Sequence, residues 1–537
     1  MNISISRVTR ALLILVCFTL GLSATGLLLR GGKAQADAVV QGIVMDSAGP
    51  LAGARVRVRA TDNLTYTNDV GEFLLNDVVA GDAIEVAAWS DGYYIASEVV
   101  TPPISGVTIT LRLYHTTDHL SYTWTNPITG TSPKSCGNCH PLLMPQWMGN
   151  AHGGSVDNAR FFSLYNGTDL SGTTAVGPGY LQDFPGTAGT CASCHAPGAG
   201  VDGYLTTGMN TARGVVTAGI HCDYCHKIGG VYLNPSTGSV YPNAPGTLSQ
   251  RVLRPPPGDN IFFGPFDDIA DPDTYLPLIS ESQFCAPCHQ FSFWGTPIYE
   301  SYNEWLASPY PAQGVTCQDC HMPPTGDIYF ASPGVGGLPH PPELIPSHLQ
   351  RGAADELLLQ ETVIMTIEVQ QIAGVLQVAV AITNTEAGHH VPTDQPGRHM
   401  ILTVGAFDNQ GVELRQFVGS QVPTWGGPEA SQPGKIYAKV LGDVESGEWP
   451  VVSYWKQSQI LSDNRLAALE SDVSIYAFAL ARPGQEVTVM ATLQFRRAPW
   501  ALMNAKGWTD PDITMETLSK TILAAPWWDV SLPLVLN

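Results

Sequence analysis

One short pattern occurs five times between residues 136 and 321 of this 537-residue chain. In each copy two cysteines stand three positions apart and a histidine directly follows the second cysteine, which gives C-x-x-C-H. The copies are Cys136–His140, Cys191–His195, Cys222–His226, Cys285–His289 and Cys317–His321. They use every cysteine of the chain except Cys17, which lies in an apolar N-terminal run. Any fold of this chain must therefore present these side chains in groups of three.

This spacing is the attachment signature of c-type haem. Two cysteines three apart can both reach the vinyl groups of one porphyrin, and the next residue then lies under the iron as an axial imidazole. A zinc half-site or a redox dithiol is the alternative for a single copy, but five copies favour five covalently bound haem c groups. The tethering residues are then Cys136, Cys139, Cys191, Cys194, Cys222, Cys225, Cys285, Cys288, Cys317 and Cys320, and the proximal iron ligands are His140, His195, His226, His289 and His321.

Residues 1–36 are typical of a secretory signal peptide. Arg7 and Arg10 precede the apolar run Ala11–Leu29, and the Ala-Gln-Ala at 34–36 is a small-x-small cleavage site. An uncleaved membrane anchor is the alternative, since the run is long enough to span a bilayer. We favour cleavage before Asp37, and no other stretch is apolar enough to cross a membrane. The mature chain is then exported, to the cell surface or beyond it, with the periplasm as the alternative.

The balance of charges is strongly acidic, because 26 Lys and Arg stand against 47 Asp and Glu for a formal net charge of −21. Such a surface argues against nucleic acids and anionic membranes as partners. It suits basic redox partners or cations.

Hydrophobic periodicity divides the mature chain into three regions. Residues 37–114 and 358–537 contain β-branched runs split by turn residues, whereas 115–357 lack sustained periodicity and are rich in Gly and Pro. Five flat, apolar porphyrins would supply the core that the middle region otherwise lacks. We predict a mixed fold, in which a loop-rich haem core with short helices lies between N-terminal and C-terminal β-sandwich-like domains.

The predicted elements are specific. Short helices carry some of the motifs, and one is expected at Tyr299–Leu306. A tight hairpin turn is expected at Asp408–Gly411. The predicted strands are Val39–Met45, Ala54–Ala60, Gly71–Leu75, Ile84–Ala88, Val107–Leu113, Val363–Val369, Leu376–Thr383, Met400–Phe407, Val412–Val418 and Val487–Phe495.

The ligand on the far side of each iron decides what the haem can do. A second imidazole gives a closed electron-transfer centre, whereas an open position permits chemistry on a substrate. His152 follows the first motif by twelve residues and is a candidate distal ligand, as is His221. His221 directly precedes Cys222, so it could bind only a neighbouring motif's iron. The histidines outside the motifs are His115, His119, His152, His221, His340, His348, His389, His390 and His399.

The segment Ala387–Thr393, which reads AGHHVPT and is followed by Arg398, resembles a segment of exported multihaem cytochromes of the extracellular electron-transfer type. The stretch EWLASPYPAQGVTCQDCHMP is similar to the same group, and the likeness covers roughly residues 130–515. The resemblance implies His389 and His348 as distal ligands. It leaves the fifth open among His115, His119 and His399, of which we assign His119.

Residues 38–114 resemble the carboxypeptidase regulatory-like family of β-sandwiches. This likeness carries no catalytic motif and implies a stabilising or adhesive module. A surface adhesin with added haems is therefore one hypothesis for the whole chain.

The leading hypothesis is an electron-transfer protein rather than an enzyme. It would pass electrons along closely spaced bis-histidine haems to other redox proteins or extracellular acceptors. Some of the cytochromes that the chain resembles form filaments in which one subunit's histidine ligates a neighbour's haem, so a homo-oligomer is a further hypothesis. The rival is a multihaem reductase or oxidase that acts on nitrite, hydroxylamine or a sulfur oxyanion at one open haem. The lack of a C-x-x-C-K motif and the surplus of histidines argue against it.

Overall fold

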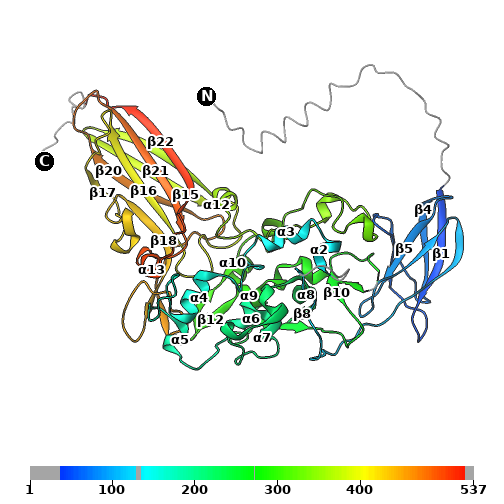
Figure 1. Ribbon diagram of the computed structural model, residues 1–537. Helices are drawn as coiled ribbons and strands as arrows, with labels where there is room; N and C mark the ends of the chain where they lie inside the picture. The colour runs from blue at the N-terminus through cyan, green and yellow to red at the C-terminus, as the bar shows by residue number, and fades with distance from the viewer. Residues whose placement is uncertain (1–36, 129–134, 271, 527–537) are drawn as a thin grey trace, which may run out of the picture.

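The computed structural model describes residues 37–128, 135–270 and 272–526. The predicted leader, residues 1–36, lies outside the described residues. Two strand-rich parts stand at opposite ends of the molecule, and a loop-rich part with short helices lies between them (Figure 1). Within the described ranges, no helix is long and apolar enough to cross a membrane. The predicted mixed fold is confirmed at this level.

The N-terminal part consists of two sheets that share one hydrophobic cluster. The sheets have the strand orders β4-β1-β7 and β3-β2-β5-β6. Val40 of β1 and Val56 of β2 are fully buried in the cluster. On β2, Arg55 and Arg57 flank Val56 and turn outward to pair with Asp267. The strands are β1 (Asp37–Met45), β2 (Arg55–Val58), β3 (Leu64–Tyr66), β4 (Glu72–Val79), β5 (Ile84–Trp89), β6 (Ala96–Val100) and β7 (Ile104–Thr110).

The middle part is built from short segments, as predicted. The helix expected at Tyr299–Leu306 is present as α10. The helices are α2 (Cys136–Cys139), α3 (Leu143–Met148), α4 (Ala159–Asn166), α5 (Tyr180–Asp183), α6 (Ala192–His195), α7 (Pro197–Gly200), α8 (Cys222–Cys225), α9 (Ala286–His289), α10 (Ser301–Leu306) and α11 (Cys317–His321). Short hairpins and pairs are formed by β8 (Ile228–Val231), β9 (Gln250–Val252), β10 (Phe262–Gly264), β11 (Asp273–Tyr275), β12 (Phe291–Phe293) and β13 (Thr296–Tyr299).

The C-terminal part again has two sheets around one cluster, with the strand orders β14-β15-β20-β17 and β19-β18-β16-β21-β22. Val378, Val380, Met400 and Leu402 come from both sheets and are fully buried. The elements are α12 (Glu356–Thr362), β14 (Val363–Ile372), β15 (Val375–Asn384), β16 (His399–Asp408), β17 (Gln416–Val418), β18 (Gly434–Asp443), β19 (Ser458–Asp463), β20 (Ser471–Ala479), β21 (Glu486–Arg496), α13 (Trp500–Lys506) and β22 (Ile513–Leu523).

The predicted turn at Asp408–Gly411 is confirmed, since the Gly411 N–H donates to the Asp408 carbonyl at 2.9 Å. The strand predicted after it, Val412–Val418, is wrong over most of its length. Only Gln416–Val418 is a strand, and it pairs with β20 of the opposite sheet. The reason is that the chain leaves β16 after a single bridge between Phe407 and Glu413 and crosses to the other sheet.

Candidate haem-binding site

Each C-x-x-C-H motif lies on one turn of helix. The N–H of His140 donates to the Cys136 carbonyl at 2.8 Å, and the same bond closes the second, third and fourth motifs at 2.9, 3.0 and 3.2 Å. Positions i, i+3 and i+4 share one face of a helix. Both thiols and the imidazole of a motif therefore project together, as a doubly tethered haem requires. Within the described residues, none of the ten motif cysteines forms a disulfide.

Hydrogen bonds orient the proximal rings. Four of the five proximal histidines place Nδ1 against an oxygen, so that the proton sits on Nδ1 and Nε2 keeps a lone pair for a metal. The fifth, His195, stacks on Phe161 with ring centroids 4.1 Å apart. The four contacts are His140 with the Phe330 carbonyl at 2.9 Å, His226 with the Phe263 carbonyl at 2.7 Å, His321 with the Arg351 carbonyl at 2.6 Å, and His289 with Asp394 Oδ2 at 3.1 Å.

Three proximal histidines face a second histidine at nearly the same separation. An iron bound by two imidazole nitrogens at about 2 Å each holds the ring centroids roughly 6 Å apart. His289 and His152 are 6.3 Å apart, His226 and His348 are 6.4 Å apart, and His321 and His389 are 6.2 Å apart. The side chains present thus fit three iron porphyrins with two imidazoles each.

Burial keeps four of the candidate ligand rings in the uncharged form that binds metal. Burial lowers the pKa of His152, His195, His321 and His348 to about 4 in each case. At neutral pH these rings are uncharged, so no proton competes for the ligating nitrogen. His289 differs, because the hydrogen bond and the charge of Asp394 outweigh burial and raise its pKa to about 9.

Two proximal histidines, His140 and His195, have no histidine ring opposite them among the described ring contacts. His221 is fully buried beside Trp124, with its Nε2 unpaired. Its Nδ1 accepts the N–H of Tyr224 at 3.2 Å, which places the ring proton on Nε2. Binding of iron through Nε2 would require this bond to break, and His221 stays a predicted ligand.

His119 lies beside His115, with ring centroids 6.3 Å apart and the planes nearly perpendicular at 84°. His115 is 3.5 Å from Asp259 at the surface. The assignment of His119 as the fifth distal ligand also stays a prediction.

The other histidines outside the motifs have structural partners. His340 lies 3.5 Å from Asp268, and His390 lies 3.4 Å from Glu304. His399, the first residue of β16 in the C-terminal part, packs on Trp425. None of these three rings contacts a proximal histidine ring within the described part of the chain.

Cysteines of different motifs contact one another. The side chain of Cys136 lies close to that of Cys222, that of Cys285 to that of Cys317, and that of Cys288 to that of Cys194. Cys225 interacts electrostatically with Cys288. The fourth motif therefore adjoins the second, third and fifth, and the third also adjoins the first.

The C-terminal part supplies His389 and Asp394 from one loop, which α10 holds. Glu304 accepts the His390 N–H at 3.1 Å and the Thr393 hydroxyl at 2.5 Å. The Ser301 hydroxyl donates to Asp394 Oδ1 at 2.6 Å. Asp394 is not among the residues predicted from the sequence, although it directly follows the Val-Pro-Thr of the segment that contains His389.

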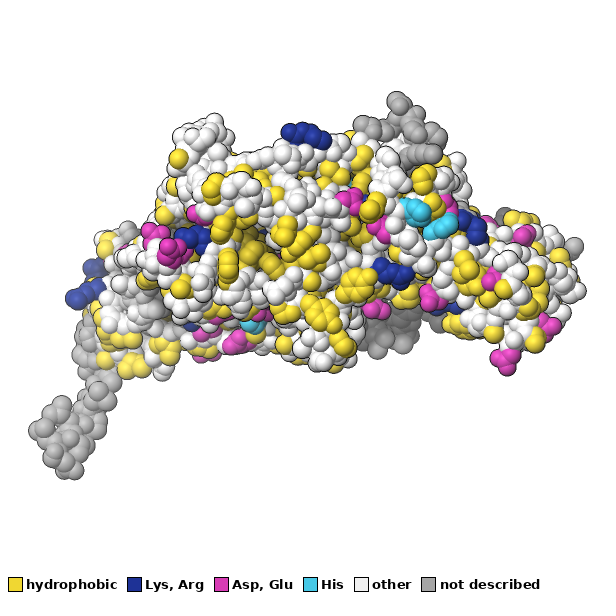
Figure 2. All heavy atoms as spheres, turned by 90° about the horizontal axis from the view of Figure 1, so that it is seen from below, with side chains coloured by type: hydrophobic (Ala, Val, Ile, Leu, Met, Phe, Trp, Pro, Cys, Tyr) yellow, Lys and Arg dark blue, Asp and Glu magenta, His cyan; other side chains and the backbone are white. Residues whose placement is uncertain are grey.

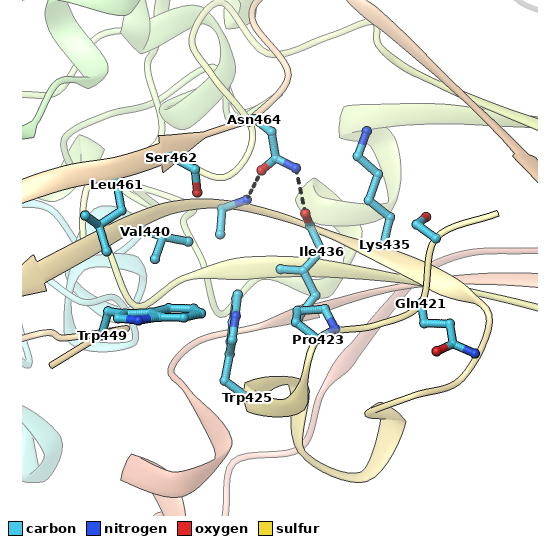
Figure 3. A pocket seen from close by; sticks show the side chains of 12 residues that line it. Gln421, Pro423, Trp425, Lys435, Ile436, Val440, Trp449, Leu461, Ser462 and Asn464 are labelled. Atoms are coloured by element: carbon cyan, nitrogen blue, oxygen red, sulfur yellow. Dashed lines mark hydrogen bonds between the residues drawn. The ribbon is translucent and has the colours of Figure 1, made fainter.

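A groove of about 390 Å³ lies elsewhere, on the outer face of β18, and Trp425 and Trp449 flank it (Figure 3). The Asn464 side chain in it is already used, since it accepts the Ala438 N–H at 2.8 Å and donates to the Ile436 carbonyl at 2.7 Å. Lys435 is paired with Asp472 at 2.8 Å. The groove thus lacks a convergent set of free polar groups, and none of the motif residues lines it.

Apolar side chains gather across the middle of the face in Figure 2. A large apolar surface is expected where a loop-rich chain covers flat apolar cofactors.

Residues 135–227 match the family of cytochrome c554 and c-prime. No curated protein matches the chain. Among solved structures, a penta-haem cytochrome c552 from Thermochromatium tepidum is similar with a TM-score of 0.54 and 20% identity, over 72% of this chain and 97% of that one. The Fcho1 Mu homology domain of Danio rerio has a TM-score of only 0.12 and 8% identity, over 26% and 44% of the two chains, which carries no argument.

The fold and the family match support a multihaem c-type cytochrome, with covalently bound haem c as the cofactor. The predicted electron-transfer class has the same support.

Proposed function

We propose that this chain is an exported electron-transfer protein with five haem c groups, one at each C-x-x-C-H motif. His152, His348 and His389 are the distal ligands for the irons of His289, His226 and His321. The observation that carries this proposal is the set of three histidine pairs with centroids 6.2 to 6.4 Å apart. Three unrelated loops reach the separation that one iron between two imidazoles requires.

Bound haem iron supplies one-electron oxidation and reduction. The protein's part would be to hold two imidazoles at each of the irons of His226, His289 and His321, which would leave those three irons no position for a substrate. The low pKa values of His152, His321 and His348 support this role, because these three rings stay neutral over the physiological range.

The cysteine contacts support an order for electron passage. A thioether ties its cysteine to the porphyrin edge, so contacting cysteines bring two edges together. The cysteines of the first motif adjoin those of the third, and the cysteines of the third adjoin those of the fourth. The cysteines of the fourth motif also adjoin those of the second and the fifth. The proposed route is branched, with the fourth motif at the junction.

The partners are other redox proteins or extracellular acceptors, and a homo-oligomer belongs to the same proposal. The irons of His140 and His195 still need distal ligands, for which His221 and His119 are predicted. In such an oligomer, the exposed His115 and the neighbouring His119 are the histidines proposed to bind a haem of a second copy of the chain.

The test is a haem count with a spin-state spectrum of the purified full-length protein. We expect five haems per chain by pyridine haemochrome and low-spin ferric signals at low temperature. A monomer in which one haem is high-spin and binds cyanide rapidly would instead support the reductase. Protein without covalently bound haem would refute the proposal altogether.

A further inference from the structure

Of the four proximal histidines whose Nδ1 faces an oxygen, one is held differently from the other three. The Nδ1 atoms of His140, His226 and His321 face backbone carbonyls, whereas Nδ1 of His289 faces the carboxylate of Asp394 at 3.1 Å. A carbonyl is a neutral acceptor, while a carboxylate carries a full negative charge. The fourth motif is therefore the one of these four with an ionised partner on its ligand.

The surroundings keep Asp394 in place and charged. Its side chain is 11% exposed. Oδ1 accepts the Ser301 hydroxyl at 2.6 Å and the Ser301 N–H at 3.3 Å, while Oδ2 is left to His289. Arg398 adds a favourable charge interaction. The carboxylate is thus fixed by two donors on one oxygen and by the imidazole on the other.

A carboxylate on the far nitrogen makes an imidazole a stronger electron donor to its metal. Greater donation stabilises the ferric state over the ferrous state, and hydrogen bonding around the ligands is one of the means by which a protein sets haem potential. We propose that Asp394 is a positioning residue that gives the haem of Cys285–His289 the lowest reduction potential of the five. This inference rests on the proposed function and deepens it.

The position of this haem makes the effect useful. Cys285 and Cys288 contact cysteines of the second and fifth motifs and lie close to Cys225 of the third. A low potential at this junction means that an electron arriving there moves on to a neighbour instead of resting there. The junction stays oxidised and open to the next electron.

The test replaces Asp394 with asparagine in the full-length holoprotein and follows a spectroelectrochemical titration. Asp394→Asn keeps the size and an acceptor oxygen but removes the charge. We expect the equilibrium constant for reduction of the lowest-potential haem to rise at least tenfold, which raises its potential by about 59 mV for one electron. The potentials of the other four haems should not change. The control is Glu300→Gln, which removes a nearby carboxylate that pairs with Lys439 and does not touch His289.

A second variant reverses the sign. Ser301→Ala removes a donor from Asp394, leaves more negative charge on the carboxylate and should lower the same component further. An equal shift in Glu300→Gln, a shift of all five components, no shift, or a new high-spin haem in Asp394→Asn would each overturn the inference. The wild-type haem count separates this result from failure of the proposed function, because that function falls only if the haems are absent or open.

Discussion

The two strand-rich ends of the molecule contact the middle part in different ways. The C-terminal end places His389 opposite His321 and Asp394 on His289. The N-terminal end, residues 37–114, contains no histidine. Its contacts with the middle part include ion pairs, such as Arg57 with Asp267 at 2.8 Å, and hydrogen bonds, such as that from the Tyr94 hydroxyl to the Asn260 carbonyl at 2.8 Å.

The N-terminal end reaches the haem site only indirectly. Tyr94 packs in a cluster with Phe263, and the Phe263 carbonyl accepts a hydrogen bond from His226 Nδ1. The two strand-rich ends thus differ in the roles proposed for them, because the C-terminal end supplies His389 and Asp394 whereas the N-terminal end packs against the segment that holds His226. Variants at the two ends should separate these roles.

The largest effect is expected from His389→Ala at the C-terminal end. Removing the ring opposite His321 leaves that iron with one protein ligand, so one haem in five should become high-spin. Electron paramagnetic resonance of the oxidised protein measures this change. The control is His390→Ala, since His390 lies beside Glu304 and has no proximal histidine opposite it. A high-spin haem in the control alone would reverse the ligand assignment.

The next largest effect concerns Lys506 of α13, which joins the C-terminal end to the middle part. Its ammonium group is fully buried and donates to the carbonyls of Ser163, Thr168 and Pro178 at 3.0, 3.0 and 2.8 Å, and to that of Val176. Lys506→Met leaves these acceptors unpaired and should cost at least about 3 kcal/mol of unfolding free energy.

Chemical denaturation of the holoprotein measures the loss. Lys435→Met is the matched control, because Lys435 is 27% exposed in its pair with Asp472 and should cost under about 1 kcal/mol. Equal losses in the two variants would show that Lys506 is not a structural anchor.

A smaller effect on the free energy of unfolding, which depends on pH, is expected from His399. This residue is buried at the start of β16. Burial lowers its pKa from 6.5 to about 4, with Arg496 and Asp512 as the charged neighbours. The unfolded chain therefore binds a proton between these values that the folded chain does not. Stability should fall as the pH drops from about 6.5 towards 4, by up to about 3 kcal/mol from this group.

The measurement compares unfolding of the wild type and of His399→Gln at several pH values in this window. The variant should lose less stability on acidification, because it lacks the buried group that must take up a proton. Parallel curves for the two proteins would contradict the prediction.

The sequence predicted what depends on short-range spacing and failed where tertiary structure decides. The grouping of two thiols and one imidazole in each motif follows from C-x-x-C-H, because one helical turn brings those side chains together. His348 and His389 came only through a resemblance, since no local pattern says which loop crosses above which iron. Asp394 was missed because its role comes from a contact with His289, 105 positions away.

The missed strands have a similar explanation. In β18 nearly every residue is buried, so the two-residue alternation on which strand prediction relies is absent. In β22 most side chains are polar or half-exposed, and its pairing with β21 supplies what the local sequence does not.

The smallest effect is expected at the N-terminal end, from Arg57→Met. Arg57 is 21% exposed, and Arg55 still pairs with Asp267 at 2.6 Å when Arg57 is removed. A partly exposed pair with a remaining partner should cost under about 1 kcal/mol. The haem count, spin states and potentials should stay as in the wild type, because Arg57 touches no iron ligand. Changed potentials in this variant, measured by the same spectroelectrochemical titration, would mean that the N-terminal end tunes the haems as the C-terminal end is proposed to do.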